Sequence, residues 1–131
     1  MSASWTTLVI GASPHPHRYS YLAVQQLQKH GYPVIALGIH EGMIDQVPIV
    51  TSWPSTPVHT VSLYLHPRHQ HQYENKLIAM HPVRVIFNPG TENAPLEQHL
   101  REAGIAVIEA CTLVLLSTHQ FETAGLNQEF N

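Results

Sequence analysis

Short aliphatic and β-branched runs alternate along the chain with stretches in which apolar residues recur at helical spacing. Runs of this kind, closed by glycine, proline or polar residues, predict β-strands. The five main predicted strands are residues 6–10, 33–37, 60–65, 83–87 and 105–108. A further short edge strand is expected at Val47–Val50, inside a connection that three prolines make irregular.

Helical patterns fill the intervals between these strands. Residues 19–30 place Leu22, Ala23 and Leu27 on one face, and Gly31 is typical of a helix C-terminus. Proline is well tolerated in a first helical turn, so a second helix is predicted to open at residues 66–67. Asn93 is a plausible N-cap of a third helix, and a C-terminal segment from residue 111 has helical character.

This alternation predicts an α/β fold with three layers, in which a parallel sheet carries helices on both faces. One domain is expected to span residues 1–131. Ligands of such sheets bind outside the carboxyl ends of the strands. That rule selects four loops, at residues 11–20, 38–40, 65–67 and 88–93.

Composition narrows the class of protein. Hydrophobic residues make up 44% of the chain, which is enough for a core and excludes general disorder. The longest apolar run, residues 105–116, contains Glu109 and is too short to span a bilayer. Residues 1–5 show no basic segment followed by an apolar one, so we expect a cytoplasmic protein without membrane association.

Charge and cysteine content exclude nucleic-acid-binding proteins and disulfide-linked or cysteine-rich zinc proteins. The net charge is −3 and only 11% of the residues are charged, which leaves no electrostatic footprint for nucleic acid. A protein with so little net charge repels its own copies only weakly, so a homo-oligomer is possible. The single cysteine excludes an intrachain disulfide and a cysteine-rich zinc site.

The first loop has the composition of a phosphate site. Gly11 permits a tight turn, and the amides at the start of the following helix favour an anion. The Ser13 and Ser20 hydroxyls can donate hydrogen bonds, and Arg18 can grip a phosphate. The alternative interpretation is a simple helix entry, with Ser20 as the N-cap and Arg18 in solvent.

Two nucleotide-binding patterns are not matched. Ser13 and Pro16 stand where the dinucleotide pattern G-x-G-x-x-G requires glycine, and no acid closes the second strand. These differences count against a conventional NAD(P)-dependent enzyme, which remains an alternative. The chain also lacks the G-x-x-x-x-G-K-[ST] sequence of a P-loop.

Several segments, in this order and spacing, resemble the small stand-alone CoA-binding domain proteins. The segments are residues 9–13, Arg18, Ser20-Tyr21, Gly31-Tyr32, residues 87–93 and residues 109–113. Those proteins are similar to the CoA-binding domain of the succinyl-CoA synthetase α subunit and have a Rossmann-like fold. The resemblance, over about residues 7–121, implies CoA, acyl-CoA or a related adenine nucleotide as ligand.

The resemblance also implies where the ligand lies, with its phosphates at residues 11–20 and the other three loops around the rest. The implied binding residues are Gly11, Ala12, Ser13, His15, His17, Arg18, Ser20, Gly38, Ile39, His40, Leu65, His66, Pro67, Asn88, Pro89 and Gly90. Many relatives have Asn-Pro, often followed by lysine, after the second strand, where this chain has residues 38–40. His40 would there supply a weaker, pH-dependent charge.

Catalysis is implied less strongly than binding, because the synthetases also use a catalytic histidine in a further domain and a partner subunit. No G-x-S-x-G elbow is present, and Cys111 is expected to be a buried small hydrophobe. The cluster of His66, His69 and His71 is expected to be exposed rather than to bind metal, because its spacing does not place all three on one helical face. A regulatory interaction module with a vestigial pocket is the remaining alternative.

Overall fold

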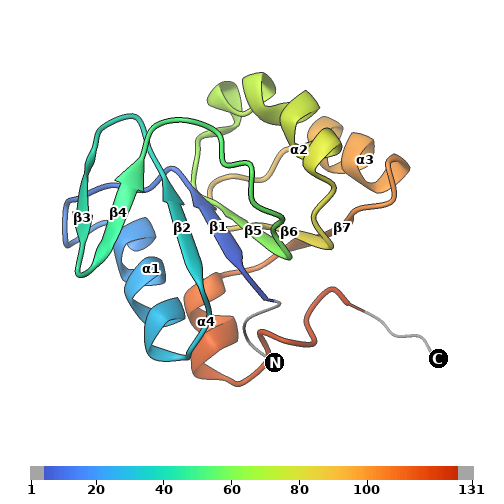
Figure 1. Cartoon of the computed structure of the whole chain (residues 1–131). Coiled ribbons are helices and arrows are strands. Elements are labelled where there is room, and N and C mark those ends of the chain that lie inside the picture. The colour runs from blue at the N-terminus through green and yellow to red at the C-terminus, as the bar shows by residue number, and fades with distance from the viewer. Residues whose placement is uncertain (1–4, 127–131) are drawn as a thin grey trace.

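The computed structural model describes residues 5–126 and contains one seven-stranded sheet (Figure 1). The strands are β1 (Thr7–Ile10), β2 (Val34–Leu37), β3 (Gly42–Ile44), β4 (Val47–Val50), β5 (Thr60–Leu63), β6 (Arg84–Phe87) and β7 (Ala106–Glu109). Their order across the sheet is β3-β4-β2-β1-β5-β6-β7, and every neighbouring pair is parallel except β3 and β4. The predicted α/β class is confirmed.

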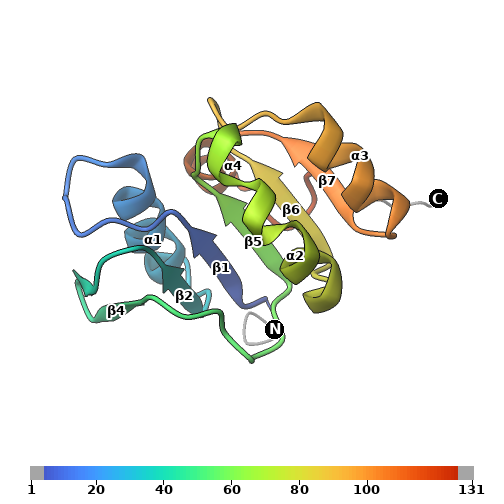
Figure 2. The same ribbon diagram turned by 90° about the horizontal axis from the view of Figure 1, so that it is seen from above.

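The helices form two layers. They are α1 (Tyr19–Lys29), α2 (Glu74–Met80), α3 (Ala94–Glu102) and α4 (Thr112–Ser117), with the short 3-10 helices η2 (Pro67–His69) and η3 (His71–Tyr73) before α2. Helices α1 and α4 pack against each other on one face of the sheet, and α2 and α3 cover the other face (Figures 1 and 2). The described residues contain no helix of the length and apolar character needed to span a bilayer.

Each face of the sheet has its own hydrophobic core, because alternate residues of a strand point to opposite faces. Leu8 and Ile10 of β1 pack with Leu77, Leu96 and Leu100 beneath α2 and α3. Val9, between them in sequence, packs on the other face with side chains from α1 and α4. All four residues of β1, β5 and β6 are buried, including the polar residues Thr7, Thr60, Ser62 and Arg84.

The connection after β2 is more regular than predicted. Gly42–Ile44 forms β3, an antiparallel strand paired with β4, and β3 is the edge of the sheet. Val47–Val50 is a strand as expected, but it lies between β3 and β2, so its assignment as an edge strand was wrong. Three residues that begin with glycine carry no recognisable strand signal.

The segment that follows β5 also differs from the prediction. The strand ends at Leu63, two residues earlier than expected, and the chain passes through η2 and η3 before α2 begins at Glu74. The buried Gln70 side chain is responsible, since its amide donates hydrogen bonds to the Leu65 and Thr91 carbonyl oxygens. These long-range bonds hold residues 65–73 against the loop after β6 rather than in one continuous helix.

The amino ends of the strands are closed by the buried side chain of Arg84. Its guanidinium donates to the Thr60 hydroxyl and to the Phe121 and Ala124 carbonyl oxygens, and it lies 4.6 Å from the Phe121 ring centroid. Burial lowers the pKa of Arg84 to about 10. Residues 121–124 are therefore hydrogen-bonded to this end of the sheet.

Candidate ligand-binding site

The carboxyl end of β1 lies at the point where the chain order of the sheet reverses. From β1 the chain continues to β2 on one side, whereas β5 lies on the other side. Loops that leave such neighbouring strands separate in opposite directions and form a crevice between them. The predicted position of the site, outside the carboxyl ends of the strands, therefore coincides with a crevice in the structure.

Gly11 makes the turn that starts this crevice. Its φ of +94° is rarely adopted by other residues, and an added Cβ would lie 3.0 Å from the Tyr64 backbone. The amides of Gly11 and Ala12 both donate to the Leu37 carbonyl oxygen, at 3.0 and 2.9 Å. The first loop is thus hydrogen-bonded to β2 through its backbone and lies against the residue that follows β5.

Gly38 allows the first two loops to approach even more closely. A Cβ at this position would lie 2.3 Å from the Ala12 carbonyl oxygen, far inside van der Waals contact. The Gly38 amide donates to the Val50 carbonyl oxygen at 3.0 Å, so the residue cannot move away without breaking this hydrogen bond to β4. Glycine is required here for close packing rather than for an unusual φ.

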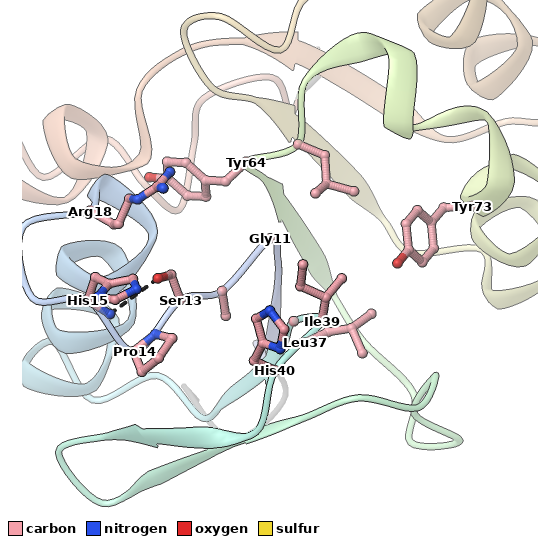
Figure 3. A pocket seen from close by; sticks show the side chains of 13 residues that line it. Gly11, Ser13, Pro14, His15, Arg18, Leu37, Ile39, His40, Tyr64 and Tyr73 are labelled. Carbon is pink, nitrogen blue, oxygen red and sulfur yellow. Dashed lines mark hydrogen bonds between the residues drawn. The ribbon is translucent and has the colours of Figure 1, made fainter.

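A cavity of about 430 Å³ opens above these two glycines (Figure 3). It is lined by Gly11, Ala12, Ser13, Pro14, His15, Arg18, Leu37, Gly38, Ile39, His40, Tyr64, Leu65 and Tyr73. The structure therefore brings together candidates from three of the four predicted loops. Pro14, Leu37, Tyr64 and Tyr73 line the cavity without having been singled out in the sequence.

The side of the cavity beside α1 is polar. Ser13, His15 and Arg18 lie there (Figure 3), and the His15 amide donates to Ser13 Oγ at 3.2 Å. This bond uses Ser13 as an acceptor, which leaves its O–H to donate. No side chain caps the start of α1, where Arg18 is the N-cap residue. Arginine, hydroxyl and helix amides are the groups that bind phosphate.

The other side of the cavity is apolar and aromatic. Leu37, Ile39 and Tyr73 lie there (Figure 3), and the aliphatic residue Ile39 is 80% exposed. The Tyr73 ring stacks on Trp53 with 5.8 Å between centroids. Lys76 Nζ lies within 5.9 Å of both ring centroids. A flat apolar group could contact the aliphatic side chains of Leu37 and Ile39 and the aromatic ring of Tyr73 here.

Tyr64 also lines the cavity, and its hydroxyl is buried near Ser62 and Thr112. The Tyr64 amide donates to the Ile10 carbonyl oxygen at 2.9 Å, which keeps the residue beside the glycine turn. Burial, and to a smaller degree the nearby Cys111, raise the pKa of the phenol above its ordinary value. Sequence reasoning assigned this residue to a strand, and the early end of β5 is what brings it to the cavity.

The fourth predicted loop does not line the cavity, because Asn88 is used inside the protein. The fully buried Asn88 amide donates to Ser62 Oγ and to the Leu63 carbonyl oxygen, and its Oδ1 accepts from the Thr112 amide. These bonds connect β5, β6 and the start of α4. Pro89 and Gly90 follow it on the exposed surface, outside the cavity.

Four further candidates also lie outside the lining. Ser20 is buried within α1, so it is not the N-cap. His66 caps η2, where its Nδ1 accepts from the Arg68 amide, and Pro67 is in the first turn. His17 is exposed, with its ring centroid 6.0 Å from that of His15.

The cluster of His66, His69 and His71 and the thiol of Cys111 lie outside the cavity lining. His66, His69 and His71 are exposed, as expected. Within residues 5–126, no three histidine, cysteine, aspartate or glutamate side chains are grouped so as to hold a metal ion. Cys111 is half-buried at the N-cap of α4 rather than fully buried, because it lies where the chain leaves β7.

Comparison with known families gives a match over most of the chain. A family model described as a CoA binding domain matches residues 5–117. The search of curated proteins found no match. The family model covers the complete cavity lining and α4.

Several solved structures have the same fold as this chain. One, described as an uncharacterized protein, is 42% identical with a TM-score of 0.87, and the match covers 91% of this chain and 99% of that one. A Thermus thermophilus protein is 23% identical with a TM-score of 0.81, covering 90% and 91%. A dinucleotide-forming acetyl-coenzyme A synthetase from Ca. Korarchaeum cryptofilum is 13% identical with a TM-score of 0.66, covering 82% of this chain and 26% of the enzyme.

Proposed function

This chain belongs to the CoA-binding domain family, and we propose from that membership that it binds CoA or an acyl-CoA in the cavity at the ends of β1, β2 and β5. The observation that supports the proposal is the division of the cavity into a polar side beside α1 and an apolar, aromatic side. A nucleotide likewise has a charged phosphate part and a flat, largely apolar base. The cavity volume of about 430 Å³ lies within the usual range for small-molecule sites.

The diphosphate is assigned to the side beside α1. Ser13 O–H, the Arg18 guanidinium and the amides at the start of α1 supply donors from one loop. Gly11 and Gly38 let the loops pack closely around this side, because a Cβ at either position would meet backbone atoms of Tyr64 or Ala12. The helix dipole adds favourable charge at the same place.

The adenine is assigned to the apolar side. Ile39 and Leu65 offer aliphatic contact from the ends of β2 and β5, and Tyr73 offers an aromatic face. The stack of Tyr73 on Trp53 holds that ring in place. His40, at the end of β2, lies where a dinucleotide site would need a carboxylate for the ribose hydroxyls. The described cavity lining contains no carboxylate, which favours a phosphorylated ribose, such as that of CoA, over the free ribose hydroxyls of NAD.

Binding without catalysis is the proposed activity. Within the described part of the chain, the cavity lining contains neither a carboxylate nor a thiol, and its histidines lie on exposed loops. A general acid or base is normally held by an orienting partner. His15 and His40 have no such partner among the side-chain hydrogen bonds of residues 5–126.

Arg18→Ala is expected to weaken CoA binding roughly 10- to 100-fold, because it removes a charge-assisted contact to phosphate. Folding should be unaffected, since Arg18 is exposed in a polar loop. Isothermal titration calorimetry measures the first effect and urea unfolding the second. Arg68→Ala is the matched control, because Arg68 is equally exposed but lies outside the cavity. Equal CoA affinity of the Arg18 variant and wild type would leave the loop as a simple helix entry.

The affinity for CoA is expected to rise as the pH falls from 8 to 6, because imidazole side chains gain positive charge over this range. His15 and His40 line the cavity and would carry the effect. Calorimetric titrations at both pH values test it, with His15→Gln and His40→Gln expected to reduce the dependence. His71→Gln, exposed and outside the cavity, should retain it. A pH dependence identical in all three variants would exclude these histidines from the site.

A further inference from the structure

The His59 imidazole directly precedes β5 and contacts the residues that attach the chain's last turn to the sheet. It is half-buried, and the Trp5 ring stacks on it with 3.9 Å between centroids. Its Nδ1 lies 2.8 Å from the Thr60 hydroxyl oxygen. That oxygen accepts from Nε and Nη2 of Arg84, whose Nη1 donates to two carbonyl oxygens of residues 121–124. A continuous set of contacts therefore joins the imidazole to residues 121–124.

These hydrogen bonds determine which nitrogen of His59 carries the proton. A hydroxyl oxygen has two lone pairs and one hydrogen, and an arginine side chain can only donate. The two bonds from Arg84, at 3.3 and 3.0 Å, use both lone pairs of the Thr60 oxygen, which leaves the hydroxyl hydrogen for His59 Nδ1. Nδ1 is therefore an acceptor, and the neutral ring carries its proton on Nε2. A second proton can be added only at Nδ1, where the Thr60 hydrogen already points.

The surroundings of His59 also oppose a positive charge on its ring. Burial, and next the Arg84 guanidinium, lower the pKa of His59, whereas the Glu122 carboxylate raises it to a smaller degree. Glu122 already accepts a hydrogen bond from the Tyr32 hydroxyl at 2.6 Å. An indole face attracts cations, but the Arg84 guanidinium already lies 5.9 Å from the Trp5 ring centroid. A protonated His59 would be a second cation beside the same ring.

We propose that His59 is a pH-sensitive switch whose protonation at Nδ1 weakens the attachment of residues 121–124 to the sheet. The Thr60 hydrogen must then turn away from the ring, and the new N–H competes with Arg84 for the lone pairs of the same oxygen. Arg84 holds residues 121–124, so a weaker bond to Thr60 loosens their anchor. The switch lies at the amino ends of the strands, opposite the cavity, and does not rest on the proposed function.

The first test compares the melting temperatures of wild type and His59→Gln between pH 8 and pH 5. The pKa of His59 is lower in the folded protein than its ordinary value of about 6.5, so the unfolded chain binds more protons as the pH falls. Wild type should therefore lose stability as the pH drops below about 6.5. Glutamine can accept the Thr60 hydrogen and does not titrate, so His59→Gln should lose less. His71→Gln, exposed on η3, is the matched control and should follow wild type. Equal losses in wild type and His59→Gln would overturn the proposal.

The second test needs no substitution at the switch. Long-range ¹H–¹⁵N spectra of the wild-type protein report the tautomer and the protonation of each histidine ring. His59 should carry its proton on Nε2 at pH 8, and the amide signals of Phe121 and Ala124 should shift with the same midpoint as its ring. Glu122→Gln should retain this shift, which separates it from titration of the carboxylate in the same segment. An Nδ1–H tautomer at pH 8, or amide signals that do not follow the His59 ring, would contradict the proposed switch.

Discussion

Replacement of Gly38 by alanine is expected to abolish CoA binding and to destabilise the protein. The new methyl group would lie 2.3 Å from the Ala12 carbonyl oxygen, and the two must separate by about 1 Å to reach van der Waals distance. Both loops line the cavity, and Gly11 and Ala12 hold the Leu37 carbonyl, so the separation deforms the proposed phosphate side. Overpacking of this kind lowers the free energy of unfolding by about 1–3 kcal/mol. Urea unfolding and calorimetric titration measure the two effects.

Gly90→Ala provides the control for this substitution. Gly90 has a φ of +92°, so alanine is strained there by about 1–2 kcal/mol, but its Cβ would meet nothing within 4 Å. The residue also lies outside the cavity. We expect a similar loss of stability with retained CoA affinity. A Gly38→Ala protein that binds CoA like wild type would show that the close contact of the two loops does not shape the site.

Asn88→Ala is expected to give the largest loss of stability of any single side-chain truncation proposed here. It removes three hydrogen bonds in a fully buried environment and leaves the Leu63 carbonyl and the Thr112 amide without their side-chain partner. We expect the free energy of unfolding to fall by about 2–4 kcal/mol, a large fraction of the stability of an ordinary domain. Urea denaturation monitored by circular dichroism measures this change.

Asn75→Ala is the corresponding control, since Asn75 is exposed on α2. The change in its free energy of unfolding should be within about 0.5 kcal/mol. The folded Asn88→Ala protein should bind CoA with an affinity near that of wild type, because Asn88 does not line the cavity. An Asn88→Ala protein of normal stability that has lost CoA binding would instead restore Asn88 to the site.

The main strands were predictable because the residue pattern that identifies each strand lies within the strand itself. Strands β1 and β6 are buried on both faces and each contains three consecutive apolar residues, whereas β5 alternates polar and apolar residues. Asn93 was likewise recognisable as the N-cap of α3, and its side chain accepts from the Leu96 amide. In both cases the residues that form an element also contain its signal.

Strand β3 and the start of α2 were not predictable for the opposite reason. Gly42–Ile44 becomes a strand because β4 pairs with it, and its own sequence has too few residues to show a period. The 3-10 turns before α2 depend on bonds from Gln70 to Leu65 and to Thr91, which lies 21 positions away along the chain. Such long-range contacts cannot be read from a local pattern.

The candidate site was predictable as a set of loops but not as a set of side chains. The rule for parallel sheets correctly selects the loops after β1, β2 and β5 for the cavity lining. Which residues of a loop face the cavity depends on where the strand ends, so Tyr64 and Leu65 line it while His66 and Pro67 do not. Asn88 shows the same limit, because only the structure reveals that its polar groups are already bonded within the protein.

The most direct test of the central proposal is a thermal-shift titration of the wild-type protein with CoA and, separately, with NAD. A ligand that binds only the folded state raises its stability, by about 2.7 kcal/mol when present at a hundred times its Kd. We expect the melting temperature to rise with CoA concentration and to change little with NAD, because the end of β2 carries His40 and no carboxylate. Stabilisation by NAD and not by CoA, or by neither ligand, would contradict the account.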